Sequence, residues 1–448
     1  MTVGESESAR MDFVKQAINA HKSTDFYKIA KTADLYDRHL NVTISEYQKL
    51  LYTVTGQVVP DNFSANYKLK TRFFNRFVVQ QNQFLLGNSI VWEKEDTADK
   101  LGEDFNRRLK EAGKAALVCG VSFGFWNMDK LQVFSLLEFV PLYDEENGAL
   151  RAGIRFWQVA DDKPLRATLY EEDGYTDYIW IKGEGQVLAD KRKYIENIRY
   201  SEIDGLEIYA GENYPTFPIV PFWGNPAKQS ELVGIQEQID CYDLIKSGFA
   251  NNVDDASMIY WTIQNAGGMD DVDLAQFVEH MKTIKAAVVS DTGAKAESHT
   301  IEAPYASREA LLDRLRKDLY EDYMALDTQN IAGGAVTATQ IKAAYEPMNE
   351  KADQYEDCVR EFIQGILSLA GVEDKPTFTR SILVNAQEEV ATVVGAAAYL
   401  DEEYVTRKIL TILGDGDKAD EVLSRITADD YMTPNEAPAE EDEEGADA

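Results

Sequence analysis

DTQNIAGGAVTATQIKAAYEPMNEKADQYE, residues 327–356, ends one helix, inserts two adjacent glycines and starts a longer helix. Before this stretch, apolar residues in 307–326 recur every three or four positions, which predicts a helix with one apolar face. Thr337 and Gln340 match a T-x-x-Q capping box, so a second helix is expected to begin there. Its apolar spacing continues to Gly371. The sequence therefore predicts two long amphipathic helices joined by a loop.

The loop between these helices has a local interpretation and a functional one, and the functional one is given below. On local grounds it is an ordinary flexible surface connection. Pro347 lies inside the second helix, where it removes one backbone hydrogen bond and crowds the preceding turn, so we expect a kink there. The residues of the loop that carry the functional interpretation given below are Asn330, Ile331, Ala332, Gly333, Gly334, Ala335 and Val336.

Length and charge limit the classes of protein to which the chain belongs. A chain of 448 residues buries a sizeable core and is expected to form more than one domain or subdomain. The formal net charge is −33, and the sequence pI is about 4.5. Such a surface repels nucleic acid over most of its area, which argues against sequence-specific reading of DNA or RNA. We also expect no membrane partner.

The cysteines and the N-terminus favour a soluble intracellular protein. Cys119, Cys241 and Cys358 are odd in number and widely spaced, which suits a reduced cytoplasm and matches neither a disulfide framework nor a zinc site. The first residues lack a basic start followed by an apolar run, so no secretory signal is expected. No stretch approaches the roughly 20 apolar residues of a membrane span.

The order of predicted elements indicates an α+β protein. Residues 12–58 are expected to be mostly helical, and a later helix is expected to end near Gly87 and lead into a strand. Between 121 and 222 the periodicity changes to that of strands. Two hairpins are expected here, about Asp173-Gly174 and Asp204-Gly205. The proline-rich end of this region suits an edge strand or an irregular linker.

The second half of the chain reads as a helical hairpin with an insert. A helix is expected over 231–253, with Ser230 as its N-cap. The insert, residues 254–305, carries strands at 257–264, 286–290 and 298–304 around one helix. Residues 376–430 form a small helical module in this interpretation. The acidic, Pro- and Ala-rich end of the chain is expected to be disordered.

Motifs that could carry catalysis are few. Gly120 to Gly124 match the G-x-S-x-G nucleophile elbow around Ser122, but a helix precedes the motif and a strand follows it, which reverses the order the elbow requires. A structural turn is favoured. The acids of 414–417 lack the ligand series of a calcium loop. We therefore assign no catalytic residue, cofactor or metal site. A serine hydrolase using Ser122 and an acidic scaffold or adaptor without a channel stay as alternatives.

Six longer stretches, taken in order, carry a family resemblance. The most specific is FPIVPFWGNPAKQSELVGIQEQIDCYDLIKSGFANNVDD, residues 217–255, with an Ile-Val-Pro, an Asn and an Ile-Asp-x-Tyr-Asp helix. In NYKLKTRFFNRFVVQQNQFLLGNSI, Ser89 stands where the pattern has proline. The other four are KTADLYDRHLNVTI, AALVCGVSFGFW, PLYDEENGALRAGIRFW and GGAVTATQIKAAYEPMNEKADQYE. Over about residues 30–420 this order resembles the portal proteins of tailed bacteriophages, in particular the siphovirus portal family.

The resemblance implies a portal-protein fold, with a mixed α/β wing, a helical stem, a small α/β clip and a helical crown. It also implies a dodecameric ring at one capsid vertex, through which double-stranded DNA passes during packaging and ejection without being read. Lys342, just after the loop, is the best candidate for a DNA contact. The implied parts are an N-terminal segment 1–33, wing 34–230, stem helix 231–253, clip 254–305, stem helix 306–328, tunnel loop 329–338, long kinked wing helix 339–371, crown 372–430 and acidic tail 431–448.

Partners and location follow from the same resemblance. The implied partners are further copies of the chain, the terminase large subunit, the major capsid and scaffolding proteins, and head–tail adaptor proteins. No nucleotide motif is present, so the energy for packaging would come from the separate terminase motor. The implied location is the portal vertex of the virion, with the host cytoplasm during assembly.

Overall fold

The computed structural model describes residues 7–52, 57–61, 64–181, 183–188, 190–200, 207–256, 260–264, 295–299, 305–329, 338–381 and 386–427. These residues form two compact units. The larger unit contains the described residues of 1–327 and 346–381, and the smaller unit contains those of 328–345 and 382–448. Within the described ranges, no helix is both long enough and apolar enough to cross a membrane.

Three helices open the larger unit: α1 (Glu7–Ser23), α2 (Asp25–Asp37) and α3 (Val42–Glu46). Thr24 caps α2, because its hydroxyl oxygen accepts a hydrogen bond from the backbone of Tyr27 at 3.2 Å. The expectation of helix as far as residue 58 is wrong in its last part. The chain leaves α3 and forms the hairpin β1 (Leu50–Tyr52) and β2 (Val58–Pro60), because this stretch is rich in Val, Thr and Tyr, which favour strands.

The next two long helices each end at a glycine. α4 (Phe73–Leu86) ends at Gly87, whose N–H donates to the carbonyl oxygen of Gln83, and β3 (Val91–Trp92) follows. After α5 (Thr97–Leu101), α6 (Phe105–Cys119) ends at Gly120, which has a φ of 89°. That left-handed conformation is accessible to glycine at little cost. The predicted helix end at Gly87 is confirmed.

The strands form two main antiparallel sheets. The first contains β4 (Val121–Asn127), β5 (Lys130–Ser135) and β13 (Ile219–Trp223) in the order β13-β4-β5. β13 is an edge strand, as its prolines predicted. The second sheet has the order β10-β9-β8-β7-β6. Its strands are β6 (Phe139–Tyr143), β7 (Leu150–Trp157), β8 (Leu165–Glu171), β9 (Gly174–Ile181) and β10 (Glu184–Val187).

Both predicted hairpins are present, with one shift of register. β11 (Ile195–Tyr200) pairs with β12 (Glu207–Glu212), and the turn between them lies outside the described residues. In the other hairpin Glu171 pairs with Gly174, so the turn residues are Glu172 and Asp173, one position earlier than expected. Gly174 is the first residue of β9. It has a φ of 137°, and a Cβ there would lie 2.2 Å from the carbonyl oxygen of Arg192. Both its backbone conformation and this close approach favour glycine.

Two hydrophobic clusters hold the larger unit together. In one, α1 covers the five-stranded sheet, and its Val14 and Ile18 are buried with Ile154 and Trp180. In the other, larger cluster, the long helix α11 (Ala338–Ala370) packs on the three-stranded sheet. Phe362 of this helix stacks on Phe222 with ring centroids 4.6 Å apart. Gly124 of β4 leaves room for the Phe362 ring, because a Cβ there would lie 2.4 Å from it.

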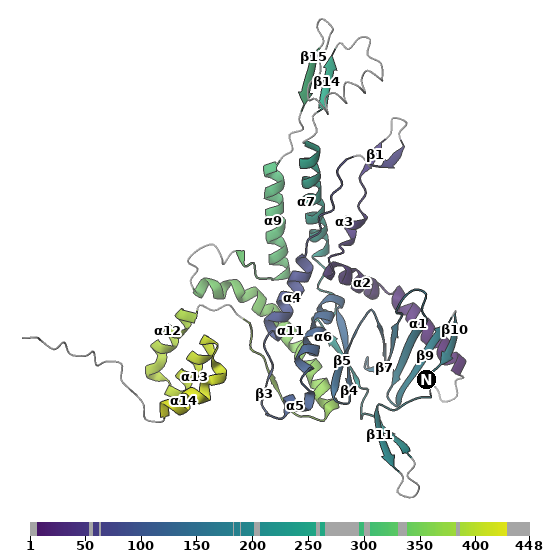
Figure 1. Ribbon diagram of the computed structural model, residues 1–448, viewed down its shortest axis with the longest axis vertical. Helices are drawn as coiled ribbons and strands as arrows, with labels where there is room; N and C mark the ends of the chain where they lie inside the picture. Colours follow the sequence, from purple (N-terminus) through teal and green to yellow (C-terminus); the bar gives the residue numbers. More distant parts are fainter. Residues whose placement is uncertain are drawn as a thin grey trace, which may run out of the picture. The chain divides into compact units, whose positions relative to one another are not determined.

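The predicted helical hairpin consists of α7 (Gln236–Ala256) and α9 (Tyr305–Tyr323), which lie side by side (Figure 1). α7 begins at Gln236 and not at 231, so Ser230 is not its N-cap. Gly234 has a φ of 94°, which interrupts the helical conformation before it is established. The Ser230 hydroxyl accepts from the backbone of Leu232 at 3.2 Å within that turn and donates to the Val118 carbonyl oxygen at 2.6 Å.

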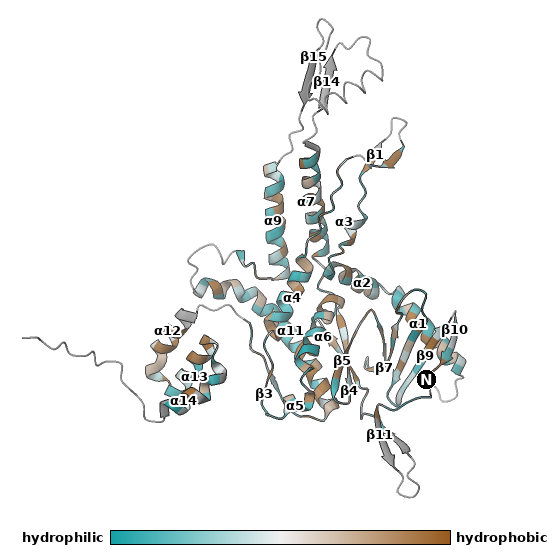
Figure 2. Cartoon of the chain, viewed as in Figure 1, coloured by the Kyte–Doolittle hydropathy of each residue, from teal (hydrophilic) through white to brown (hydrophobic). Residues whose placement is uncertain are grey.

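Hydropathy along the two helices is mixed. Figure 2 shows hydrophilic and apolar residues alternating along both α7 and α9, so neither helix is apolar all round. This is the pattern of a helix with one face packed and another exposed.

The insert between α7 and α9 is described only in part. β14 (Tyr260–Gln264) pairs with β15 (Lys295–His299). β15 begins at 295, three residues before the strand expected at 298–304. The predicted helix of the insert and the strand expected at 286–290 lie outside the described residues.

The boundary of the C-terminal module lies later than expected. β16 (Pro376–Thr377) pairs with β3, and Phe378 packs on the larger core, so residues 372–381 belong to the larger unit. The smaller unit has α12 (Ala386–Ala396), α13 (Glu402–Leu413) and α14 (Ala419–Thr427), with short 3-10 turns η1 (Ala397–Tyr399) and η2 (Gly416–Lys418). Gly414, with a φ of 86°, ends α13, so the glycine-rich 414–417 stretch is a helix stop. The acidic tail lies outside the described residues.

Candidate functional site

The residues predicted to face a channel are only partly described. Asn330, Ile331, Ala332, Gly333, Gly334, Ala335 and Val336 lie outside the described residues. Lys342 is exposed on the second turn of α11, and Pro347 is exposed inside the same helix. Their roles, and the kink expected at Pro347, stay predictions.

Ser122 is placed as a structural residue and not as a nucleophile. It lies in β4, is fully buried, and its hydroxyl donates to the Ala112 carbonyl oxygen at 2.8 Å. A nucleophile elbow exposes its serine on a turn from strand to helix, and here the helix α6 comes first. Ser122 is therefore not positioned to act as the nucleophile of a serine hydrolase. Among the described residues, no group of His, Cys, Asp and Glu is arranged to hold a metal ion.

α7 and α9, called the stem pair here, are joined near both ends. Phe249 and Tyr305 meet edge to face with ring centroids 5.6 Å apart. Next to them, the Arg308 guanidinium donates to the Gly248 carbonyl oxygen at 3.4 Å. At the other end, the amide of Gln238 donates to the carboxylate of Asp322. The two helices are therefore fixed in register along their length.

The opposite side of α7 carries polar side chains that bind an extended segment, residues 67–71. The backbone N–H of Tyr67 donates to Asn251 Oδ1 at 2.6 Å, and that of Leu69 donates to the Ser247 hydroxyl at 2.9 Å. Asn251 and Ser247 are themselves buried. These side chains satisfy backbone groups that an edge strand would otherwise pair with another strand.

One turn earlier on α7, Asp243 continues the series. It accepts from Asn41 Nδ2, and the same amide donates to the Thr71 carbonyl oxygen at 3.2 Å. Burial raises the pKa of Asp243, against hydrogen bonds from Thr71 and Asn41 that lower it. Contacts thus recur at alternate residues of the segment and at every fourth residue of the helix. The two spacings match, because two extended residues span about 6.6 Å and four helical residues rise about 6 Å.

A buried charge joins the base of the stem pair to α11. Lys351 Nζ lies 2.6 Å from Glu231 Oε2, and the two side chains are only 16% and 9% exposed. The same ammonium donates to the Tyr323 carbonyl oxygen at 3.0 Å and lies 3.4 Å from the centroid of the Tyr323 ring. Burial lowers the pKa of Lys351, while the attraction of Glu231 raises it in part. We call Lys351, Glu231 and Tyr323 the stem junction.

Two tyrosines, Tyr323 of the stem junction and Tyr355 of α11, donate hydrogen bonds to side chains of α4. Tyr323 donates to Gln81 Oε1 at 2.7 Å, and Tyr355 donates to Asn82 Oδ1 at 2.9 Å. Burial raises the pKa of both phenols well above the usual value. Gly113 of α6 makes room for the second phenol, because a Cβ there would lie 2.1 Å from the Tyr355 hydroxyl. A displacement of α9 against α11 would therefore break desolvated polar contacts, which makes the junction stiff.

Sequence reasoning missed these residues, although their spacing held a signal. Lys351 lies on the apolar stripe of its helix, three residues after Met348 and four before Tyr355. A single charge on such a stripe indicates a buried partner. Ser247 and Asn251 likewise repeat at the four-residue spacing of a polar face. What the sequence did not contain was the identity of the partners, which lie far away in the chain.

Two phage portal proteins are similar to this chain in sequence. The portal protein of Clostridium phage phiCD119 is 26% identical over 342 residues, covering 70% of this chain and 73% of the relative. The portal protein of Bacillus phage SPP1 is 24% identical over 392 residues, covering 78% of this chain and 74% of the relative.

Solved structures are similar at a lower level. A chain in the virion of a native gene transfer agent particle is 11% identical, with a TM-score of 0.45, and the match covers 76% of this chain and 89% of that one. A chain in the neck of an empty gene transfer agent particle gives a TM-score of 0.46 at 11% identity, over 76% of this chain and 90% of that one.

The family model described as "Phage portal protein, SPP1 Gp6-like" matches residues 15–430. This match runs from α1 to the end of α14, so it includes the stem pair, the stem junction and the helices of the smaller unit. The resemblance drawn from the sequence motifs is thereby confirmed, and the chain belongs to the SPP1 Gp6-like family of phage portal proteins.

Proposed function

We propose that copies of this chain assemble into a ring, dodecameric in the virion, that forms the channel for double-stranded DNA at one capsid vertex. The observation that carries the proposal is the family match over residues 15–430. The stem pair supports it, because two helices held in register and interrupted by one insert suit a rigid wall with a separate tip.

Within this proposal the parts of the chain take the roles implied by the resemblance. α7 and α9 are the stem, the insert between them is the clip, and residues 372–430 are the crown, of which 382–430 belong to the smaller unit. Residues 34–230, with the long helix 339–371, are the wing, and residues 1–33 are a separate N-terminal segment. The loop 329–338 faces the DNA, with Lys342 close behind it. The net charge of −33 per copy supports passage of DNA, because a surface of the same sign as the phosphates does not hold them.

The proposed partners follow from this position. The clip docks the terminase large subunit, which supplies the energy for packaging, and later the head–tail adaptor proteins. The wing and stem meet the major capsid and scaffolding proteins. The ring is assembled in the host cytoplasm and stays at the portal vertex of the virion, where DNA leaves again on ejection.

Electron microscopy of the purified protein in negative stain tests the proposal. We expect rings with a central hole, and native mass spectrometry gives the number of copies. Compact monomers under all conditions that support capsid assembly would contradict the channel and favour an acidic adaptor.

A further inference from the structure

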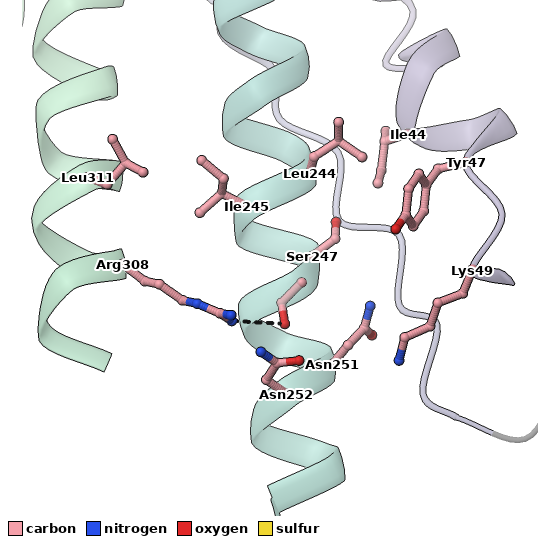
Figure 3. Close-up of a pocket in the computed structure, with 11 residues that line it drawn as sticks. Ile44, Tyr47, Lys49, Leu244, Ile245, Ser247, Asn251, Asn252, Arg308 and Leu311 are labelled. Carbon is pink, nitrogen blue, oxygen red and sulfur yellow. Dashed lines mark hydrogen bonds between the residues drawn. The ribbon is translucent and has the colours of Figure 1, made fainter. Parts of the chain in front are cut away.

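The stem pair carries a shallow groove that no other part of the described chain covers. Ile245 of α7 points toward Leu311 on the α9 side, and Leu244 points toward Tyr47 on the α3 side (Figure 3). The groove has a volume of about 510 Å³. Leu311 is 45% exposed and Tyr47 is 44% exposed. The lining also includes the polar or charged side chains of Lys49, Asn252 and Arg308. Exposed apolar side chains gathered within a polar rim are the pattern of a surface that a partner covers.

The β1–β2 hairpin, called the arm here, presents a second exposed apolar surface. Leu50 pairs with Pro60, and the register places position 58 on the same face two residues away. Leu50 is 53% exposed, Val58 is 51% exposed, and Pro60 is exposed as well. A two-stranded hairpin with its apolar face in water is at best marginally stable. Something that covers this face would stabilise it.

The arm is held firmly at its base. The contacts of Ser247 and Asn251 with segment 67–71 fix the chain that leaves the arm against α7. On the other strand, Lys49 Nζ donates to the Ala65 carbonyl oxygen at 3.2 Å, and the Lys49 carbonyl oxygen accepts from the backbone of Asp61 at 2.8 Å. The arm therefore leaves the stem at a defined place, and the cost of ordering it for a partner is already reduced.

The positions of arm and groove fit a contact between copies. α9 lies on one side of α7 and α3 lies on the other in both views (Figures 1 and 3). Figure 1 places the arm on the α3 side. In a closed ring each copy uses two different surfaces, one toward each neighbour, so an exposed apolar patch on one side requires a complementary patch on the other. The arm and the α9 wall of the groove are such a pair.

We propose that the apolar face of the arm of one copy packs against Leu311 and Ile245 in the stem groove of the next copy. This inference rests on the proposed ring. The contact is apolar, so it adds a salt-insensitive attraction between copies that repel one another through a net charge of −33 each.

Thiol cross-linking tests the contact. In a Cys241→Ser background, which removes the exposed cysteine, Val58→Cys and Leu311→Cys are combined and treated with a short bismaleimide. We expect a ladder of covalent multimers on a denaturing gel, and no ladder from either single substitution, because each places a thiol on one side of the contact only. The matched control replaces Val58→Cys by Val159→Cys, since Val159 is 82% exposed but belongs to the loop after β7.

A second measurement does not depend on cross-linking geometry. Leu50→Ser with Val58→Ser should raise the protein concentration for half-assembly about tenfold, because apolar area is lost from the contact. The thermal unfolding of dilute, unassembled chain should not change, since both side chains are exposed within one copy.

The outcomes separate this inference from the ring itself. Rings without the ladder, or rings of the double serine variant at the unsubstituted concentration, would overturn the arm contact and leave the channel in place. Coupling of Val58→Cys to the capsid protein in place of a second copy would overturn it as well. Absence of rings from the unsubstituted chain would overturn the proposed function, and the arm contact with it.

Discussion

Replacing Glu231 by Gln should destabilise the larger unit through the charge that it leaves behind. The substitution keeps the size of the side chain and its contact with Asn225, whose amide donates to Glu231 Oε1 at 2.9 Å. It removes the negative charge 2.6 Å from Lys351 Nζ. Among the described residues, the buried Lys351 ammonium then keeps the carbonyl oxygen and the ring face of Tyr323 as its partners.

The size of the effect has both an expected range and a ceiling. Removing one partner of a buried ion pair costs about 3 to 5 kcal/mol. Lys351 can also escape by losing its proton, and deprotonating a lysine with a pKa of about 10.4 at pH 7 costs about 5 kcal/mol. We therefore expect the free energy of unfolding to fall by about 3 to 5 kcal/mol at pH 7.

The pH dependence identifies the cause. In the variant, the pKa of Lys351 in the folded chain falls further below its value in the unfolded chain. Between those two values the unfolded chain binds the proton and the folded chain does not, so stability rises with pH. The deficit of Glu231→Gln should therefore shrink from pH 7 toward pH 10. Adding Lys351→Met removes the stranded charge and should recover part of the loss.

Urea unfolding followed by tryptophan fluorescence, at one protein concentration for all variants, measures these differences. Asp25→Asn is the matched control, because Asp25 is 91% exposed in its pair with Lys28 and its loss should cost well under about 1 kcal/mol. A deficit that does not change with pH, or a double variant whose loss equals the sum of the two single losses, would refute the reasoning.

Three further predictions concern the proposed channel. Deleting residues 330–335 should leave rings intact but lower DNA packaging in a packaging assay with terminase, and loss of soluble rings would count against the assignment of the loop. Pro347→Ala restores a backbone donor inside α11, so the free energy of unfolding should stay the same or rise by up to about 3 kcal/mol. DNA packaging should fall if the working ring needs the kink. Unchanged packaging would show that the proline is incidental. Replacing the clip, residues 254–305, by a short linker should abolish capture of the terminase large subunit without unfolding the wing, and equal capture by intact and deleted rings would place the motor site elsewhere.

Much of the fold follows from the local sequence. The spacing of apolar residues predicted the helices α4, α6, α9 and α11, and the glycines that end α4 and α11 were recognised from the same pattern. Helix periodicity and glycine stops are properties of a few consecutive residues, so they are legible without the rest of the chain. The order of the motifs sufficed to identify the family, which the family match confirms.

The residues that join distant parts of the chain were decided by packing. Serine is a residue type that commonly caps helices, which predicted Ser230 as the N-cap. The left-handed backbone conformation of Gly234 instead delays the start of α7 to Gln236. Lys351 was missed although it is a charge on an apolar stripe, and its partner Glu231 lies 120 positions away in the sequence. Local propensity sets where a helix runs, whereas burial and the surrounding side chains choose which distant charge or amide can satisfy it, because only the packed chain fixes the distances between them.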